Sequence, residues 1–258
     1  MTVHDKVDVG RAGLVREMLN RSAGMLTERI DALEQTALQL LVAGPLAPEV
    51  VADAVRTAHQ LVSLGVFGLD RGAELAKRAE ELLRAPGEPG EQGAALADLV
   101  ESLRAEVATA LTSPPVQRTA PLAETIPTSA TSAPDVLLVE DDRVLVGLLT
   151  RALEAQGYTV AVVSDGAAAV AALDVPAEQR ARLVLLDVDL PALDGFGVLR
   201  ALSARALLPG VPVLVLTARA SEPEVLSVLS LGAVDHIAKP FSLPVLLARV
   251  ARASGRVQ

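Results

Sequence analysis

Residues 183–195 read Leu-Val-Leu-Leu-Asp-Val-Asp-Leu-Pro-Ala-Leu-Asp-Gly, and this stretch decides the fold of the carboxyl-terminal half. Four bulky apolar residues lead directly into Asp187, and Pro191 and Gly195 signal a turn soon afterwards. A short apolar run with such an end is typical of a strand buried on both faces. Open α/β sheets bind ligands at the carboxyl ends of their strands. Asp187 is therefore the first candidate for a functional side chain.

The same pattern of short apolar runs and helix-length stretches continues on both sides of Asp187. The runs are rich in β-branched residues, which favour strands. We predict strands over residues 136–139, 159–163, 183–186 and 213–216, with a weaker one over 234–237. We predict helices over residues 143–156, 166–173, 196–206, 222–229 and 242–253. Five βα units of this length indicate one domain, residues 135–258, with a doubly wound parallel sheet.

The amino-terminal half has helical periodicity and almost no strand signal. Apolar residues recur at spacings of three and four over residues 14–41, 48–65, 71–84 and 94–111. Glycine and proline separate these segments, so we predict an all-α four-helix bundle over residues 8–111. Residues 112–134 contain five prolines and eight serines or threonines. Such a composition predicts a flexible linker, and the chain is therefore expected to be multidomain.

Composition excludes several classes of function. The 258 residues include no cysteine, which excludes disulfides, thiolate metal sites and cysteine nucleophiles. The net charge is −9 and both halves are acidic, so we expect no binding to nucleic acid. No apolar run approaches the length that spans a bilayer, and the start of the chain does not resemble a signal peptide. We expect a cytoplasmic protein without a membrane partner.

Polar side chains follow the predicted strands at the point where each strand ends. Glu140 and Asp141 follow the first strand, Asp187 the third, Thr217 the fourth and Lys239 the fifth. Acids on neighbouring strand ends repel each other unless a hard cation lies among them. Carboxylates with few other protein ligands suit Mg²⁺. A hydroxyl and an ammonium beside the acids have the chemistry to hold phosphoryl oxygens.

Residues 135–258 resemble the receiver domain of two-component response regulators. The resemblance is carried by Leu-Leu-Val-Glu-Asp-Asp at residues 137–142, by the quoted stretch from residue 185, and by Val-Leu-Thr-Ala at 215–218. Gly-Ala-Val-Asp at 232–235 and Ile-Ala-Lys-Pro-Phe at 237–241 complete it, in the family's order and spacing. The resemblance implies a flavodoxin-like sheet with strand order 2-1-3-4-5.

The resemblance also implies a role for each residue of the site. Asp187 is the expected phosphoacceptor. Mg²⁺ is expected on Asp141 and Asp187, with Glu140 acting through water and the Asp189 backbone carbonyl completing the metal site. Asp142 is then a neighbour, not a ligand.

The remaining expected roles concern phosphate binding and the conformational switch. Thr217 resembles the switch hydroxyl and Lys239 the phosphate-binding lysine, and Lys239-Pro240 is commonly a cis bond in such domains. His236 stands where the family usually has Tyr or Phe, so either the switch is weaker or pH-sensitive, or His236 is a solvated loop residue. The Asp189 side chain, two residues after the acceptor, is a candidate for altering phosphoryl lifetime by ordering water or pairing with Arg219.

The segment around His59 resembles the active helix of histidine phosphotransfer (HPt) domains. The match covers residues 58–69 and continues through Ala-Glu-Leu-Ala at 73–76. The helical pattern predicts an exposed His59, surrounded by small apolar residues that include Val62 and Val66. Many HPt domains have lysine and then glycine where this chain has Val62 and Ser63, although Arg56 is a possible substitute for the missing charge. A degenerate bundle used for docking or dimerisation and an unrelated helical bundle remain alternatives.

Together these features predict a phosphorelay signalling protein, not an enzyme with turnover. The receiver is expected to take a phosphoryl group from a sensor histidine kinase or phosphotransfer protein and to exchange it with His59, within the chain or with another receiver. One alternative is a binding module that phosphorylation controls, with a passive bundle. A less favoured alternative is a haloacid-dehalogenase-type phosphatase, suggested by Asp187-Val-Asp189. That motif usually opens its domain, is followed by Gly-Thr and has its acidic pair downstream, unlike here.

Overall fold

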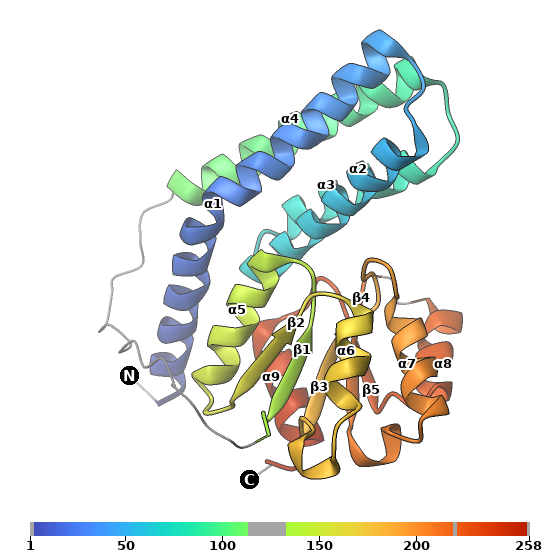
Figure 1. Ribbon diagram of the computed structural model, residues 1–258. Helices are drawn as coiled ribbons and strands as arrows, with labels where there is room; N and C mark the ends of the chain where they lie inside the picture. Colours follow the sequence, from blue (N-terminus) through green and yellow to red (C-terminus); the bar gives the residue numbers. More distant parts are fainter. Residues whose placement is uncertain (1–2, 113–132, 219–220, 257–258) are drawn as a thin grey trace. The chain divides into compact units, whose positions relative to one another are not determined.

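The computed structural model describes residues 3–112, 133–218 and 221–256. These residues form two compact units, which are described separately here: a helical unit and a unit built on a sheet (Figure 1). Of the predicted linker, residues 113–132 lie outside the described ranges. Within those ranges no helix is both long enough and apolar enough to cross a membrane.

The first unit consists of helices alone, in the order that the sequence predicts. It contains α1 (Val3–Ala43), α2 (Pro48–Leu61), the 3₁₀ helix η1 (Val62–Phe67), α3 (Asp70–Arg84) and α4 (Pro89–Thr112). Helix α1 packs along α4, and α3 packs against both α2 and α4. Helix α4 begins at Pro89, earlier than predicted, because proline is well accommodated in the first turn of a helix.

The core of this unit is formed by apolar residues at helical spacing. Leu26, Ile30 and Leu33 of α1 and Leu96 and Leu103 of α4 are at most 1% exposed. Burying a leucine or isoleucine side chain stabilises a fold by roughly 1.5–3 kcal/mol. The stripe that sequence periodicity identifies is therefore the contact between α1 and α4.

The predicted helix over residues 48–65 changes its geometry at Val62, where η1 begins. A 3₁₀ helix has about 3.0 residues per turn, so side chains beyond Leu61 rotate away from the directions that an α-helix gives them. Val62 and Val66 are only 2% and 6% exposed. The prediction that they form a solvent-facing patch stays a prediction. Gly68, with φ of 78°, ends η1 in the left-handed conformation that glycine adopts without strain.

The second unit is a five-stranded parallel sheet with strand order β2-β1-β3-β4-β5, as predicted. The strands are β1 (Val136–Val139), β2 (Val160–Val163), β3 (Leu183–Asp187), β4 (Val213–Thr217) and β5 (Asp235–Ala238). The helices between and after them are α5 (Arg143–Glu154), α6 (Gly166–Leu173), α7 (Gly195–Ala204), α8 (Glu222–Ser230) and α9 (Leu243–Ala253). Two short 3₁₀ turns, η2 (Ala177–Gln179) and η3 (Leu208–Gly210), precede β3 and β4.

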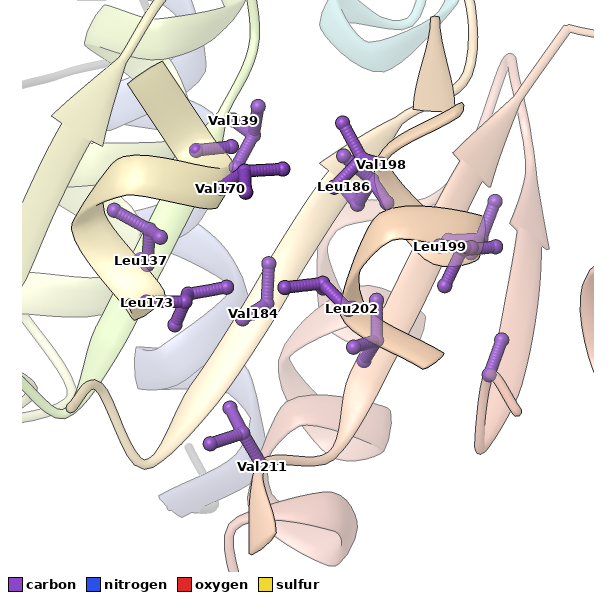
Figure 2. Packing of buried hydrophobic residues seen from close by; sticks show 14 of the residues in the cluster. Leu137, Val139, Val170, Leu173, Val184, Leu186, Val198, Leu199, Leu202 and Val211 are labelled. Atoms are coloured by element: carbon purple, nitrogen blue, oxygen red, sulfur yellow. The ribbon is translucent and has the colours of Figure 1, made fainter. Parts of the chain in front are cut away.

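Alternate residues of the central strands pack against opposite layers of helices. Leu137 and Val139 of β1, with Val184 and Leu186 of β3, share a cluster with residues of α6 and α7 (Figure 2). Successive strand residues point to opposite faces, so their neighbours in sequence face the other side of the sheet. Because both faces are covered, the strands read as continuous apolar runs. The polar residues that follow them are consequently concentrated at the strand ends.

Candidate functional site

Three carboxylates meet at the carboxyl edge of the sheet. Strand β1 pairs with β3, and Val139 lies opposite Leu186. Glu140 and Asp141, which follow β1, are thereby brought beside Asp187, the last residue of β3. One carboxylate oxygen from each of the three lies within 4.8 Å of the others. The neighbouring strand ends thus create the acidic cluster that the sequence predicts.

Lys239 places its ammonium between two of these acids. Its Nζ atom lies 2.9 Å from Oε2 of Glu140 and 3.0 Å from Oδ1 of Asp187. The backbone N–H of Lys239 donates to the Thr217 carbonyl over 2.6 Å, which fixes the chain immediately after β5. The bond between Lys239 and Pro240 is cis, as expected.

Asp187 is fully buried, yet its carboxylate accepts no hydrogen bond from the described residues. The Lys239 ammonium is close enough to Oδ1 for an ion pair. A buried carboxylate without hydrogen-bond donors is costly unless cations neutralise it. The carboxylate oxygens of Asp187 can therefore bind a cation or accept hydrogen bonds, and two further acids lie beside them.

The donor set fits Mg²⁺. Magnesium prefers oxygen ligands and is usually held by one or two carboxylates together with water and phosphate oxygens. Glu140, Asp141 and Asp187 offer such oxygens within reach of one another, and the Asp187 oxygens are not committed to hydrogen bonds. One lysine does not balance this much buried negative charge, so a divalent cation suits the cluster.

Burial and mutual charge shift the protonation of this cluster. Burial raises the pKa of Glu140 well above its ordinary value, the charge of Asp187 raises it further, and Lys239 offsets this only in part. Burial alone would lower the pKa of Lys239, but the charges of Asp187 and Glu140 outweigh burial and raise it. Lys239 therefore remains an ammonium at neutral pH.

Asp142 has a structural role beside the acidic cluster. Its Oδ1 accepts a hydrogen bond of 2.9 Å from the backbone N–H of Val144 and caps the amino terminus of α5. Its own backbone N–H donates to Oε1 of Glu140 over 3.2 Å. Asp142 thus orients Glu140.

The turn after Asp187 depends on Gly195, which sequence reasoning treated only as a turn signal. The backbone N–H of Gly195 donates to the Val188 carbonyl over 2.9 Å. A Cβ atom at Gly195 would lie 2.5 Å from the Asp187 carbonyl oxygen, closer than any side chain tolerates. Asp194 caps α7 by accepting a 2.6 Å hydrogen bond from Gly197. Gly195 therefore allows α7 to start directly against the backbone of Asp187.

The other predicted residues of this site lie around the same edge. Thr217 ends β4 and is 5% exposed, and Asp189 is half-buried in the loop after β3. The His236 side chain on β5 is 28% exposed, and its carbonyl accepts a hydrogen bond of 2.8 Å from Arg249. Arg219, the suggested partner of Asp189, lies outside the described residues. The roles of Thr217, His236 and the Asp189 carbonyl remain predictions.

His59 lies in the helical unit, near the end of α2. The exposure of its ring stays a prediction. Its Nδ1 atom lies 3.1 Å from Oε2 of Glu80 on α3, which draws the ring toward that helix. Sequence reasoning missed Glu80, although its spacing from Ala76 and Leu83 places this acid on the buried face of α3.

Comparison with known proteins concerns the second unit. Residues 136–251 match the family model described as the response regulator receiver domain. Over 115 residues the chain is 45% identical to the response regulator MprA of Mycobacterium sp. strain KMS and 44% identical to that of Mycobacterium avium strain 104. Each alignment covers 45% of this chain and 48% of the relative. The chain thus spans about half the length of these curated relatives.

Solved structures align with the same part of the chain. A Francisella response regulator receiver domain aligns with 48% of this chain and 99% of its own, with 27% identity and a TM-score of 0.44. The receiver domain of a sensor histidine kinase from Pseudomonas aeruginosa PAO1 has 34% identity, the same coverages and a TM-score of 0.43. That structure is described with a magnesium ion coordinated in its active-site cleft. On the family match, residues 136–251 of this chain form a response regulator receiver domain, a module of two-component phosphorelay signalling.

Proposed function

We propose that this protein relays phosphoryl groups, and that its receiver accepts one on Asp187 from a phosphohistidine donor. The observation that supports this most directly is the Asp187 carboxylate: it is fully buried, accepts no hydrogen bond from the described residues and lies beside the Lys239 ammonium. A carboxylate held in this way is a nucleophile with a cation already in place. The donor is a sensor histidine kinase or a phosphotransfer protein.

In the proposed transfer, an oxygen of Asp187 attacks the phosphorus of phosphohistidine. The P–N bond breaks, its electron pair returns to the imidazole nitrogen, and an acyl phosphate forms on Asp187. The Lys239 ammonium stabilises the developing charge on the phosphoryl oxygens, and the Thr217 hydroxyl donates a hydrogen bond to one of them. Mg²⁺ on Glu140, Asp141, Asp187 and the Asp189 carbonyl would supply further neutralisation of phosphoryl charge.

Labelling with acetyl phosphate and Mg²⁺ tests the acceptor. We expect one phosphoryl group per chain in the wild type, seen as a single mass increase that hydroxylamine removes because it cleaves acyl phosphates. Asp187→Asn should abolish the label, whereas Asp194→Asn should keep it because asparagine also caps helices well. Labelling that persists in Asp187→Asn would show that the acceptor has been assigned wrongly.

We propose that His59 exchanges this phosphoryl group with Asp187 or with another receiver. The support is the resemblance to the active helix of HPt domains and the neighbouring Glu80 carboxylate. The test is whether acid-labile, base-stable phosphate appears on the chain once Asp187 is labelled. It should disappear in His59→Gln and persist in His4→Gln. Phosphate that remains in His59→Gln would refute the exchange.

One alternative is that the helical unit only docks or dimerises. If wild-type protein labelled on Asp187 never carries phosphohistidine with any receiver partner, the docking alternative stands. Sustained hydrolysis of a small phosphomonoester, in place of single labelling, would instead support a phosphatase.

A further inference from the structure

The two edge strands of the receiver sheet differ in how they are protected. Strand β5, at one edge, carries Asp235, which is bound by Arg249 and Arg252, and Pro240 follows soon after the strand. Charged residues and proline on an edge strand oppose its pairing with another strand. Strand β2, at the other edge, lies in the run Thr-Val-Ala-Val-Val-Ser at residues 159–164, which has neither charge nor proline. The edge formed by β2 is therefore open to a further strand.

Strand β2 uses only one of its two hydrogen-bonding sides. It pairs in parallel with β1 and with no other strand of the described residues. The carbonyls of Thr159 and Val163 accept hydrogen bonds from backbone N–H groups of the β1 segment. Because backbone groups alternate in direction along a strand, the N–H and C=O groups of Val160 and Val162 point away from β1. They are the row of donors and acceptors that an edge strand offers to a partner.

The side chains of β2 add an exposed apolar residue to this edge. Ala161 and Val163 pack against the cluster formed with α6 and α7, on one face of the sheet. Val160 and Val162 share the opposite face, since side chains two residues apart point the same way. Val162 is 42% exposed. Its side chain therefore remains to be covered beside the outward backbone groups.

We propose that β2 pairs antiparallel with β2 of a second copy of this chain, about a two-fold axis at Ala161. In this register Val160 of each copy lies opposite Val162 of the other, and the two residues of such a pair exchange both backbone hydrogen bonds. Each exposed Val162 then packs against the directly opposite Val160 of the second copy. The two five-stranded sheets become one continuous sheet.

The same register brings opposite charges together at both ends of the paired strands. It places Gly157 of one copy opposite Asp165 of the other. Arg256 donates to the Gly157 carbonyl over 3.1 Å, and its side chain is 41% exposed. Arg256 and Arg182 both pair with Asp135, so this cluster of two arginines and one aspartate is net positive. This charge complementarity favours a second copy over an unrelated strand.

The antiparallel arrangement keeps the two phosphoacceptor sites apart. The strands of the two copies run in opposite directions, so their carboxyl ends, with Asp187 at each, lie at opposite edges of the joined sheet. The acidic clusters of the two copies therefore do not face each other. Because one pair of short strands buries little surface, the dimer is expected to be weak.

Sedimentation equilibrium of the full chain, with interference optics, tests for this dimer over roughly 10 µM to 1 mM. We expect a monomer–dimer equilibrium in the wild type. Val162→Lys should raise the dissociation constant by about 10-fold or more, because a charge on an edge strand opposes pairing. Val245→Lys, a matched change at a valine that is 47% exposed on α9, should leave it unchanged. A monomeric wild type, or a dimer that Val162→Lys does not weaken more than Val245→Lys, overturns the proposal.

A single introduced cysteine tests the register, because the chain has no cysteine of its own. At the axis, the two copies of Ala161 form a pair with Cα atoms about 4.5 Å apart, which is within the range for a disulfide. Ala161→Cys should therefore form a disulfide dimer on mild oxidation. Ser164→Cys should not, because the two copies of this exposed residue would be roughly 20 Å apart along the strands.

Denaturing gels without reductant separate the linked from the unlinked chains, and circular dichroism checks that both cysteine variants are folded. The cross-linking is done at a concentration where the wild type is dimeric. Equal cross-linking of Ala161→Cys and Ser164→Cys, or none of Ala161→Cys, overturns the proposed register.

Salt dependence tests the paired charges. Asp165→Asn removes the charge and keeps the cap of α6, because asparagine also caps helices well. It should weaken the dimer at low salt, and the difference from the wild type should disappear near 1 M salt, where screening acts within about 3 Å. Asp194→Asn changes the cap of α7 in the same way and should have no effect. An Asp165→Asn dimer as strong as the wild type at low salt contradicts the register.

Discussion

The Nζ atom of Lys239 lies 3.0 Å from Oδ1 of Asp187, and the same ammonium lies 2.9 Å from Glu140. The side chains of Lys239, Glu140 and Asp187 are 5%, 1% and 0% exposed. One cation thus serves two buried carboxylates, and the cluster keeps a net negative charge. The stability of the site therefore depends on Lys239, and the remaining negative charge favours the binding of a second cation.

Replacing Lys239 by methionine should destabilise the receiver. Removing one partner of a buried ion pair costs roughly 3–5 kcal/mol, because the remaining charge is left uncompensated. The loss should shrink as the pH falls, because the Glu140 carboxyl, whose pKa is already raised, then takes up a proton. The chain has one tyrosine, Tyr158, and no tryptophan, so tyrosine fluorescence during urea unfolding reports this unit alone. Equal stability of Lys239→Met and the exposed control Lys77→Met at pH 7 would contradict the expected cost.

Magnesium should stabilise the receiver through the acidic cluster. A ligand at a free concentration of about 100 times its Kd adds roughly 2.7 kcal/mol to the free energy of unfolding. Asp141→Asn should remove most of this increment. Asp142→Ala should lower stability by about 1 kcal/mol through the lost helix cap, yet keep the response to Mg²⁺. Fluorescence-monitored unfolding with Mg²⁺ or with EDTA measures both effects, and an undiminished response in Asp141→Asn would exclude this residue as a ligand.

Alanine at Gly195 should disturb the acceptor loop. The added Cβ would lie 2.5 Å from the Asp187 carbonyl oxygen, so the backbone must shift. We expect a loss of about 1–3 kcal/mol, as for other overpacked sites, together with slower labelling by acetyl phosphate. Gly210→Ala is the matched control, because nothing lies within 4 Å of a Cβ there. Gly195→Ala with wild-type stability and labelling would show that the loop adapts freely.

Asp135 should make the stability of the receiver depend on pH. Thr159 donates to its Oδ2 from the backbone N–H over 3.0 Å and from the hydroxyl over 3.1 Å. Burial raises the pKa of Asp135, but these hydrogen bonds and the charges of Arg256 and Arg182 outweigh burial and lower it.

Because the pKa of Asp135 is lower in the folded state than in the unfolded state, its carboxylate stabilises the fold at pH values above the pKa of the unfolded state. This contribution is lost as the pH falls through the pKa of the folded state. We expect Asp135→Asn to cost roughly 1 kcal/mol at pH 7. The difference from the wild type should begin to shrink below about pH 4, near the ordinary aspartate pKa. Urea unfolding at several pH values measures this, and a constant difference down to pH 2 would contradict it.

The sequence predicted the receiver closely because its signals are local and repeated. Each buried strand contains a continuous apolar run, and each functional residue comes directly after such a run, as Asp187 comes after residues 183–186 and ends β3. Predicted and observed strand ends differ by at most one residue. In a parallel sheet, the carboxyl ends of the strands lie at the same edge. Residues at these ends, such as Glu140, Asp187 and Lys239, are therefore brought to that edge.

The helical unit was predicted less completely, and His59 shows why. The sequence identifies its segment and its helix, but not its pairing with Glu80 on α3. The prediction placed the side chains on one ideal α-helix. It therefore took no account of the change to 3₁₀ geometry at Val62 or of a partner on α3. Glu80 itself looked like an ordinary charged residue of an amphipathic helix.

The order of elements, the acidic edge of the sheet and the candidate acceptors could all be predicted from the sequence, because periodicity and strand ends are properties of neighbouring residues. The folded structure was needed to find the contact of Gly195 with the Asp187 backbone, the pairing of Glu80 with His59, and an Asp187 carboxylate that accepts no hydrogen bond from the described residues. Those facts depend on distances between residues far apart in the chain. Such distances are set by how strands and helices pack, which no local pattern encodes.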